Sequence, residues 1–321
     1  MKMINKRRLF LLFVFIILLL ISIKIGVIKF SYIDLIKGDE NTLSLLFSSR
    51  LPRTLAIILS ASSLSIAGLI MQSIGHNNFI SPSTIGTSDA ALFGILISYI
   101  LFGSQSLSFK LTYAFIFAFI STLLLVRILN RLKLKEPIYV PLVGMMYGSI
   151  IASFSTFIAH QFDASQVLSS ISLGSFTTMT KGRYELLWII VIPLIISFIY
   201  ATQFSLIRVG QDFALNLGLK VKHVVFIGLL IVSVVSASTF VTVGPLPFIG
   251  LIIPNLIRIY YGDNLKRSML DIALFGSIYV LVNDIISRLI IFPYEVSVGF
   301  TMGITGSIIF IWLIIRGRKY A

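Results

Sequence analysis

Cysteine is absent from this chain of 321 residues, and charged residues make up only 12% of it. The lack of cysteine excludes disulfides and thiolate metal sites, and it leaves the redox compartment undecided. A soluble domain carries about 25% charged residues, so the low charge content excludes an ordinary soluble fold. No polar stretch is long enough to form a soluble catalytic domain.

The sequence motifs of familiar enzymes are also missing. The chain has no G-x-x-x-x-G-K-[ST] phosphate loop, no H-E-x-x-H zinc motif and no G-x-S-x-G nucleophile turn. Its three histidines, His76, His160 and His223, fall at the ends of different apolar segments, so no metal cluster is expected. We therefore predict a chain that is not an enzyme and that binds neither a metal nor a cofactor of its own.

Apolar residues dominate what is present, at 57% of the chain, with a mean hydropathy of +1.01. A membrane-spanning helix needs about 20 predominantly apolar residues. On that rule the sequence predicts an all-α polytopic membrane protein, with residues 1–321 forming a single transmembrane domain of ten spans. The predicted spans are 9–28, 51–74, 84–103, 108–130, 138–160, 185–205, 223–243, 247–262, 268–291 and 296–316.

The basic residues set the predicted orientation. The net charge of +14 does not indicate nucleic-acid binding, because the Lys and Arg residues are scattered at the ends of the spans. Most of the 26 fall on one side if both termini are cytoplasmic, as the positive-inside rule favours. The N-terminal Lys6-Arg7-Arg8 followed by Leu9–Ile23 resembles a signal peptide in outline. However, its apolar run continues toward Ile28 without a small-residue cleavage motif, so we predict an uncleaved first span.

The stretch Val243–Arg258 is apolar enough to lie at membrane depth, yet it is interrupted. Prolines and glycines prevent one unbroken helix, and the freed backbone groups must be satisfied by protein or by a water-lined cavity. Interrupted segments of this kind often line transport routes. A fainter counterpart at Gly68–Gly86 runs the opposite way through the membrane, as an inverted repeat would require. The predicted hinge residues are Gly244, Pro245, Pro247, Gly250 and Pro254.

A cytoplasmic loop, Leu206–Lys222, contains a second feature. Residues Gln211–Leu219 favour a short helix with apolar and polar side chains, and Gly218 offers its C-terminal turn. A loop that only links two spans needs no such helix, so it is a candidate docking element. The alternative is an interfacial helix that lies on the lipid surface.

Three residue pairs predict packing rather than chemistry. Gly144-x-x-x-Gly148 and Gly299-x-x-x-Gly303 let helices approach closely. Asp284 and Arg288 stand four residues apart on the ninth span, where an ion pair is the ordinary interpretation.

With these features, the sequence resembles the permease subunits of ABC importers for iron–siderophores, haem and vitamin B12, the FecCD-type family. The resemblance covers nearly the whole chain, and its finer placement in the iron-siderophore branch rests on overall likeness. Its motifs are Arg50-Leu-Pro-Arg53, Ala67-Gly68…Gln72…Asn77…Pro82…Gly86, Ala214…Leu217-Gly218, Gly244-Pro245…Phe248-Ile249-Gly250-Leu251…Pro254…Arg258, Asp284…Arg288 and Val298-Gly299.

The resemblance implies a type II ABC importer permease in a bacterial cell membrane. Its expected partners are a second permease subunit, identical or a divergent paralogue, two cytoplasmic ATPases that bind ATP and Mg²⁺, and an external, lipid-anchored binding protein. The expected substrate is an iron–siderophore complex of the catecholate type, and no nucleic acid is involved. Haem or cobalamin stays open as the substrate. A secondary transporter coupled to ions or protons stays open as an alternative class.

The resemblance also assigns roles to residues. Arg50 and Arg53 at the outer mouth, with Arg288, would pair with carboxylates of the binding protein. Such pairs steer encounter more than they add affinity. The alternatives are arginines that snorkel to lipid headgroups and, for Arg288, an internal ion pair with Asp284. The ATPase-coupling residues would be Gln211, Asp212, Ala214, Leu217 and Gly218.

A gate is expected where the family narrows the route at its cytoplasmic end. Ordinary loop and cap chemistry is the alternative for these residues. Asp89 is an acid within the third predicted span, where carboxylates tend to face the bundle interior and mark function. It would instead be structural if it lay near the interface and bonded to Thr87 or Ser88. The predicted route and gate residues are Gln72, Asn77, Phe79, Ser81, Pro82 and Asp89.

Two departures from the family pattern affect the expected lining of the route. The family usually has proline after the asparagine at Asn77, where this chain has Asn78. It usually has histidine before the arginine of the central motif, where this chain has Asn255. Both changes keep the helix-breaking prolines, and both bear on the substrate.

Overall fold

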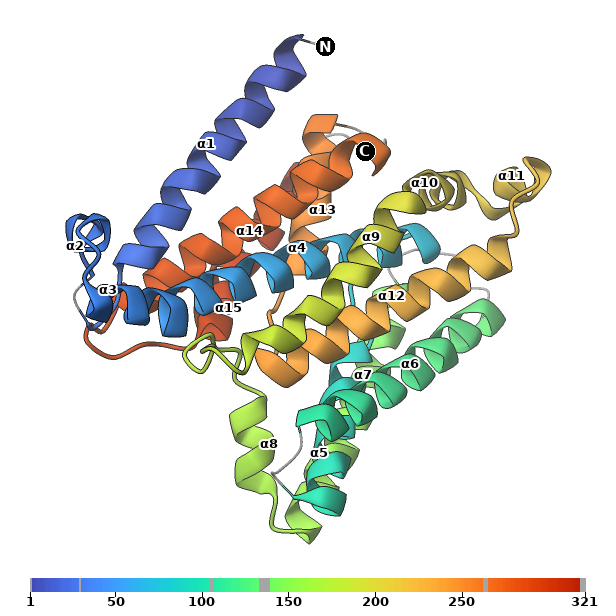
Figure 1. Cartoon of the computed structure of the whole chain (residues 1–321). Helices are drawn as coiled ribbons and strands as arrows, with labels where there is room; N and C mark the ends of the chain where they lie inside the picture. The colour runs from blue at the N-terminus through green and yellow to red at the C-terminus, as the bar shows by residue number, and fades with distance from the viewer. Residues whose placement is uncertain (1, 29, 104–106, 133–138, 262–264, 318–321) are drawn as a thin grey trace.

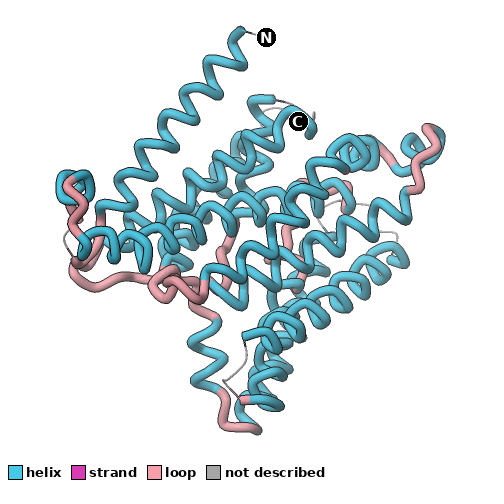
Figure 2. The backbone as a smooth tube through the Cα atoms, in the orientation of Figure 1, coloured by secondary structure: helices cyan, strands magenta, loops and turns pink. Residues whose placement is uncertain are grey.

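A computed structural model describes residues 2–28, 30–103, 107–132, 139–261 and 265–317. These residues form helices joined by loops, without a β-strand among them (Figures 1 and 2). The first helices are α1 (Lys2–Lys24), α2 (Tyr32–Ile36), α3 (Glu40–Leu45), the π-helical turn η1 (Leu46–Arg50), α4 (Leu51–Ile74), α5 (Thr87–Phe102), α6 (Leu107–Leu132), α7 (Tyr139–Gln161) and α8 (Ser165–Ile171). The remaining helices are the 3₁₀ turn η2 (Tyr184–Ile190), α9 (Val191–Ile199), α10 (Ala201–Val209), α11 (Gln211–Asn216), α12 (Val221–Thr242), α13 (Ile249–Tyr261), α14 (Leu265–Leu289) and α15 (Val298–Gly317).

The helices confirm a polytopic all-α protein. Within the described ranges, six helices are long and apolar enough to cross a membrane, or seven if one bent pair counts as a single span. Helices α5 and α13 are apolar but shorter. Each predicted span contains a helix or a bent pair of helices, and the count of ten spans stays a prediction.

The sixth predicted span, 185–205, is not one straight helix. It begins as a 3₁₀ turn, becomes α-helical at Val191, and bends by 58° between Ile199 and Ala201. Pro193 lies in the first turn of α9, where a missing N–H is tolerated, and this position accounts for the start of the α-helix at Val191.

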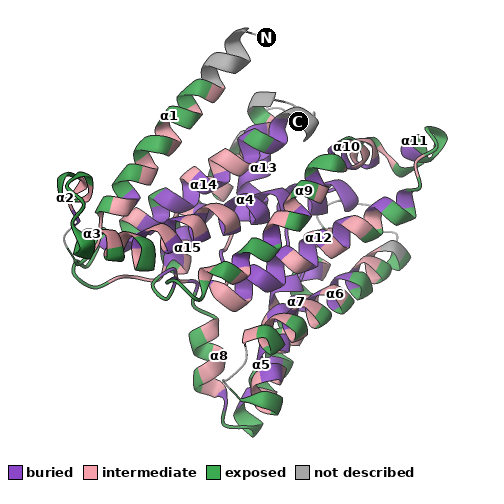
Figure 3. Cartoon of the chain, in the orientation of Figure 1, coloured by how far each residue is buried: buried purple, intermediate pink, exposed green. Residues whose placement is uncertain are grey.

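Helix α4 is the centre of the molecule. Its span is 78% buried, compared with 22% for both α7 and α15 (Figure 3). Its most extensive contacts are with α14, α13, α12 and η2. The exposed apolar faces of α7 and α15 suit lipid or another subunit, because hydrocarbon is as apolar as the side chains that face it.

Short helices precede α4 at one end of the bundle. Ser31 caps α2 through Asp34 N, and Asp39 caps α3 by accepting from Thr42 N at 2.8 Å. Asp39 Oδ2 also accepts from Thr42 Oγ1 at 2.6 Å, and the side-chain and backbone hydrogen bonds from Thr42 together lower the pKa of the Asp39 carboxyl. The chain then continues through η1 into α4, whose first turn contains Pro52 in a position that needs no N–H donor.

Helices α1 and α14 run parallel, and hydrogen bonds join them near both ends. Near their N-terminal ends Arg8 Nε donates to Asp271 Oδ1 at 2.9 Å. Near their C-terminal ends Arg288 Nη2 donates to Ser22 Oγ at 2.7 Å. Parallel first and ninth spans are what a ten-span topology requires.

Candidate functional site

Two helix breaks form the structural centre of the candidate site. The first break is residues 75–86, between α4 and α5, and the second break is residues 243–248, between α12 and α13. Each break contains a glycine in the left-handed region, Gly86 (φ +73°) and Gly244 (φ +85°). Each is followed by a helix too short to span the membrane by itself. This shared order supports the predicted inverted repeat.

Residues in or next to both breaks pack against the same face of α4. A Cβ added at Gly68 would collide with the Gly250 carbonyl, so the two backbones approach as closely as glycine allows. Gln72, which is buried on the same face, donates to the carbonyls of Gly250 and Leu251 at 3.4 Å. Pro82 Cδ lies 3.2 Å from where a Gly250 Cβ would be. The predicted residues Gln72, Pro82 and Gly250 are therefore brought together.

Aromatic side chains link both breaks to α15. Phe310 contacts Phe79 of the first break, with ring centroids 6.1 Å apart, and Phe248 of the second break at 6.3 Å. Phe248 has a positive φ of 64°, which is unusual for a bulky residue and is found mainly at functional sites. Phe248 belongs to the recognised motif, but nothing in the sequence indicated that Phe310 joins it to Phe79.

The polar residues of the first break make local hydrogen bonds. Asn77 Oδ1 accepts from Phe79 N at 2.8 Å, and Ser81 N donates to Thr84 Oγ1 at 2.8 Å. Asn77, Ser81 and Pro82 are buried, while Phe79 is 39% exposed. The loop chemistry expected as the alternative is thus present, and a gate at these residues stays a prediction.

The two departures from the family pattern, Asn78 and Asn255, contact each other. Asn255 Nδ2 donates to the Asn78 carbonyl at 2.7 Å. The Asn78 side-chain oxygen in turn accepts from Arg208 Nη2 at 2.7 Å and from Arg258 Nη1. We name Asn78, Arg208, Asn255 and Arg258 the inner cluster. It joins the first break to α13 and to the end of α10.

Helix α11 confirms the short helix expected from Gln211. Figure 1 shows it at one tip of the molecule, after α10. Ala214 is fully buried, whereas Phe213, Leu215 and Leu217 are about half exposed. Gly218, at φ +78°, turns the chain after the helix.

The beginning of α11 also lies beside the first break. Gln211 lines a pocket of ≈ 260 Å³ together with Gly75 and His76. Asp212 lies next to it in the first turn of α11. A helix with exposed apolar side chains that shares a pocket with the break is suited to transmit a rigid-body movement. The coupling role of its residues stays a prediction.

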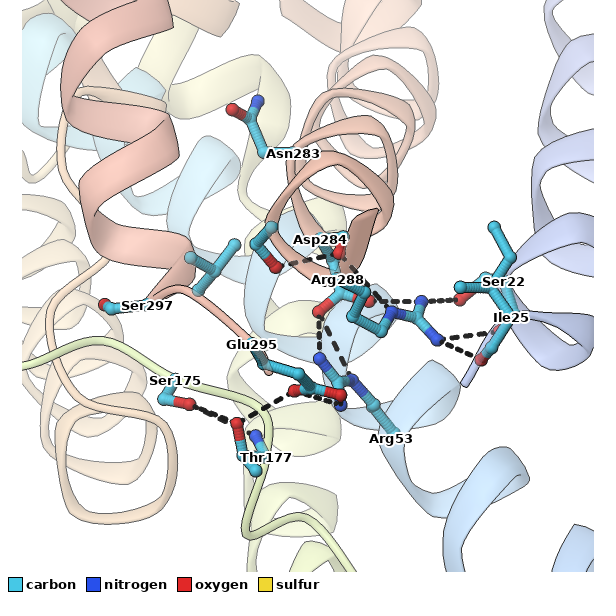
Figure 4. Close-up of polar contacts among 12 residues, drawn as sticks. Ser22, Ile25, Arg53, Ser175, Thr177, Asn283, Asp284, Arg288, Glu295 and Ser297 are labelled. Carbon is cyan, nitrogen blue, oxygen red and sulfur yellow. Dashed lines mark hydrogen bonds and ion pairs between the residues drawn. The ribbon is translucent and has the colours of Figure 1, made fainter. Parts of the chain in front are cut away.

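Two of the three arginines assigned to docking belong to a charged network at the other end of α4 (Figure 4). Arg53 donates to Asp284 Oδ1 and to Glu295 Oε2, both at 2.8 Å. Arg288 pairs with Asp284 Oδ2 and donates to the carbonyls of Ser22 and Ile25 at 2.9 Å. Glu295 also accepts from Thr177 Oγ1 at 3.0 Å.

The structure gives the three arginines expected at the docking surface partners within the chain itself. Arg288 is buried and Arg53 is 12% exposed, and both pair with the buried carboxylate of Asp284. The ion pair of Arg288 with Asp284 is the alternative stated from the sequence. Arg50 is also buried and donates to the carbonyls of Ile25 and Ile28. Burial of a guanidinium is costly unless it is paired, so the chain supplies partners. Docking through these arginines stays a prediction that requires exchange of partners.

Asp89 lies in the first turn of α5, where the helix dipole favours a carboxylate. It is half-buried against the middle of α7, and a Cβ added at Gly148 would lie 2.6 Å from Asp89 Oδ2. Gly144 packs as closely, since its added Cβ would lie 2.8 Å from the Thr84 carbonyl oxygen. The predicted approach at Gly144 and Gly148 is confirmed, whereas a Cβ added at Gly303 would have no described atom of another helix within 4 Å.

The described residues contain no group of three His, Cys, Asp or Glu side chains that could hold a metal ion. The absence of a cofactor and of a metal stays an expectation from the sequence.

Comparisons with known proteins agree with this architecture. The model of the FecCD transport family matches residues 13–316. The petrobactin import system permease protein YclN of Bacillus subtilis (strain 168) is 48% identical over 312 residues, covering 97% of this chain and 99% of YclN. The petrobactin import system permease protein FatD of Bacillus anthracis is 36% identical over 306 residues, covering 95% and 92%.

A solved structure shows the same fold at lower sequence identity. It is described as an inward-facing conformation of a metal-chelate type ABC transporter, and it matches with a TM-score of 0.82 at 22% identity, covering 97% of this chain and 99% of that chain. The helix breaks, the inner cluster and the charged network of Arg53 thus lie in a fold shared with that structure. The match over residues 13–316 shows that the chain belongs to the FecCD transport family.

Proposed function

We propose that this chain is the membrane permease subunit of an ATP-driven importer of iron–siderophore complexes. The observation that carries the proposal is its 48% identity, over nearly its whole length, to a permease named for petrobactin import. The geometry supports it, since residues next to both helix breaks pack on α4, and the beginning of α11 lines a pocket together with Gly75 and His76 of the first break. A catecholate siderophore is the finer part of the proposal.

The partners follow from the same proposal. Two cytoplasmic ATPases would contact the exposed apolar side chains of α11 and would bind the ATP and Mg²⁺ that this chain does not hold. A second permease subunit would cover part of the apolar surface left open on α7 and α15. An external, lipid-anchored protein would deliver the substrate. Both termini would be cytoplasmic, in a bacterial cell membrane.

The direct test measures uptake in cells that lack the gene and carry it back on a plasmid. Ferric petrobactin, ferric anguibactin, haem and cobalamin are supplied one at a time. We expect the restored gene to rescue uptake of at least one ferric siderophore. Rescue of haem or cobalamin alone would replace the proposed substrate class, and rescue of none would refute the proposal.

A second experiment separates an ABC importer from an ion-coupled transporter, for which Asp89 would be the coupling carboxylate. Asp89→Asn keeps the shape of the side chain and loses only its charge at the α5 N-terminus, a stabilising effect of about 0.3–1 kcal/mol. We expect uptake to persist in this variant and after collapse of the proton gradient. We also expect uptake to stop when the partner ATPase is inactivated. Loss of uptake both in the Asp89→Asn variant and after collapse of the proton gradient would favour the ion-coupled alternative.

A further inference from the structure

A second pocket lies on the other side of the molecule's helix set from the first pocket: it borders the start of the second break at Val243 and Gly244, and none of Arg53, Asp284, Arg288 and Glu295 lines it. Its volume is ≈ 410 Å³, and its walls come from α5, α6, α8, the loop after α8 and the end of α12. Two of the lining residues are cations, Lys110 and Arg183, and no carboxylate lines the pocket. Hydroxyl groups of Tyr99, Ser170 and Thr178 add possible donors.

The two cations lack internal partners. Lys110 and Arg183 are close enough to repel each other. Within the described part of the chain, neither forms an ion pair. Glu185, the acid nearest to Arg183 in sequence, instead accepts from Gly182 N at 2.9 Å and does not line the pocket. Two facing cations in a pocket are unfavourable alone and favourable around an anion.

The rest of the lining indicates an amphiphilic anion. Apolar side chains share the walls with the cations, among them Ile95, Leu107 and Phe240. A site for a small inorganic ion would gain nothing from these walls, whereas an acyl chain would bury apolar surface against them.

The position of the pocket indicates a lipid. Lys110 stands in the first turn of α6 and Arg183 directly precedes η2, so both lie at helix ends on the predicted outer side. Trp188 is 49% exposed about one turn further along the chain. Tryptophan is enriched at the headgroup level of membranes, and basic pockets between spanning helices bind acidic headgroups.

We propose that this pocket binds the phosphate headgroup of an anionic phospholipid of the outer leaflet, with Lys110 and Arg183 holding the phosphate. The acyl chain lies along the apolar wall. Because Val243 and Gly244 also line the pocket, the bound lipid contacts the start of the second break.

The test uses the full-length chain, purified with its partner subunits, and native mass spectrometry after addition of phosphatidylglycerol, phosphatidylcholine or inorganic phosphate. We expect retention of phosphatidylglycerol over phosphatidylcholine. We expect the double variant Lys110→Gln, Arg183→Gln to weaken that binding about thirtyfold. The variant Lys110→Arg, Arg183→Lys keeps both charges and should retain it, as should Lys181→Gln, which removes a nearby exposed lysine outside the pocket.

Two results would overturn the proposal. The first is equal lipid retention by the wild type and the Gln double variant, provided that both assemble with their partners. The second is equally tight binding of inorganic phosphate without a preference for phosphatidylglycerol, which would assign the pocket to a free anion. The measurement is of lipid retention and not of uptake, so its failure leaves the proposed transport function unaffected.

Discussion

At the scale of single residues, Asp284 is the fully buried acid of the charged network that includes Arg53. Its carboxylate is fully buried and accepts from Arg53 of α4 and Arg288 of its own helix. Glu295 is the second acid and brings the four charges to balance, but it is 20% exposed. In a medium of low polarity, a buried charge without its partner is strongly destabilising.

We therefore expect Asp284→Ala to lower the free energy of unfolding by about 3–5 kcal/mol, because the buried guanidinium of Arg288 loses its only carboxylate partner among the described residues and Arg53 loses one of two. Glu295→Gln is the matched control: Arg53 keeps Asp284, and loss of a partly exposed pair costs about 0–1 kcal/mol. Unfolding of both variants in mixed detergent micelles measures the difference. Equal losses would show that depth of burial does not distinguish the two acids.

The three arginines stood out in the sequence, but most of their bonding partners did not. The Asp284–Arg288 pair was predictable because the residues stand four apart on a helix. The Arg53 bonds join residues separated by 231 and 242 positions, and no periodicity reports contacts at that distance. Glu295 and Asp271 were missed for the same reason. Docking partners were expected for these arginines, and the structure gives them partners within the chain, so docking through them stays a prediction.

At the scale of elements, the inner cluster connects the first break to the end of α10, which leads into α11. Arg208 stands three residues before α11, and its guanidinium holds Asn78 of the break. A displacement of α11 would therefore be passed to Asn78 through a charged hydrogen bond. The cluster also holds α13 through Asn255.

We expect Arg208→Gln to lower the number of substrate molecules imported per ATP by about tenfold or more, since a hydrogen bond to a charged group contributes about 1.5–3 kcal/mol. Asn78→Ala should have a similar effect, and the double variant should be no worse than either. Arg127→Gln, an exposed arginine of α6, is the control. Transport and ATPase rates in proteoliposomes measure this ratio. Additive losses would contradict a shared pathway.

The contact of α4 with α13 gives a second prediction at this scale. Gly68→Ala would place a methyl group against the Gly250 backbone, which cannot move aside as a flexible side chain can. We expect a loss of about 1–3 kcal/mol. Gly303→Ala on α15 meets open space and should be neutral or stabilising by up to about 1 kcal/mol. Thermal unfolding of the two variants measures this contrast, and a stable Gly68→Ala protein would refute the close approach.

Helix boundaries were predictable where the sequence marks them. The span 51–74 coincides with α4, because Pro52 suits a helix start and Gly75 follows its end. The breaks before α5 and α13 follow from their glycines and prolines. The bend between α9 and α10 was not predicted, because nothing in the sequence at Tyr200 or Ala201 marks it. The short helices α2 and α3 were also missed.

At the scale of the whole molecule, the lack of cysteine makes the topology directly measurable. A single introduced cysteine has no background thiol. Ile36, the last residue of α2, is 86% exposed, and we expect the Ile36→Cys variant to react with a charged maleimide in intact cells. Leu217→Cys, 58% exposed after α11, should react only after the membrane is permeabilised. The opposite pattern would invert the predicted orientation.

The parallel packing of α1 and α14 has a consequence for how the protein is made. Helix α14 carries two fully buried acids, Asp271 and Asp284, and each would cost about 2.5–3.5 kcal/mol at the centre of a lone span. Their arginine partners on α1 and α4, Arg8 and Arg53, are synthesised more than 200 residues earlier. We therefore expect the early helices α1 and α4 to promote the insertion of α14, because a lone helix with two acids inserts poorly.

This consequence can be measured during synthesis. We expect Arg8→Ala with Arg53→Ala to leave more of α14 outside the bilayer, shown by protease cleavage of nascent chains in membrane vesicles. Unchanged insertion would mean that α14 enters without help. If insertion of α14 depends on Arg8 and Arg53, the ion pairs between early and late helices stabilise the membrane-inserted protein only after α14 has been synthesised.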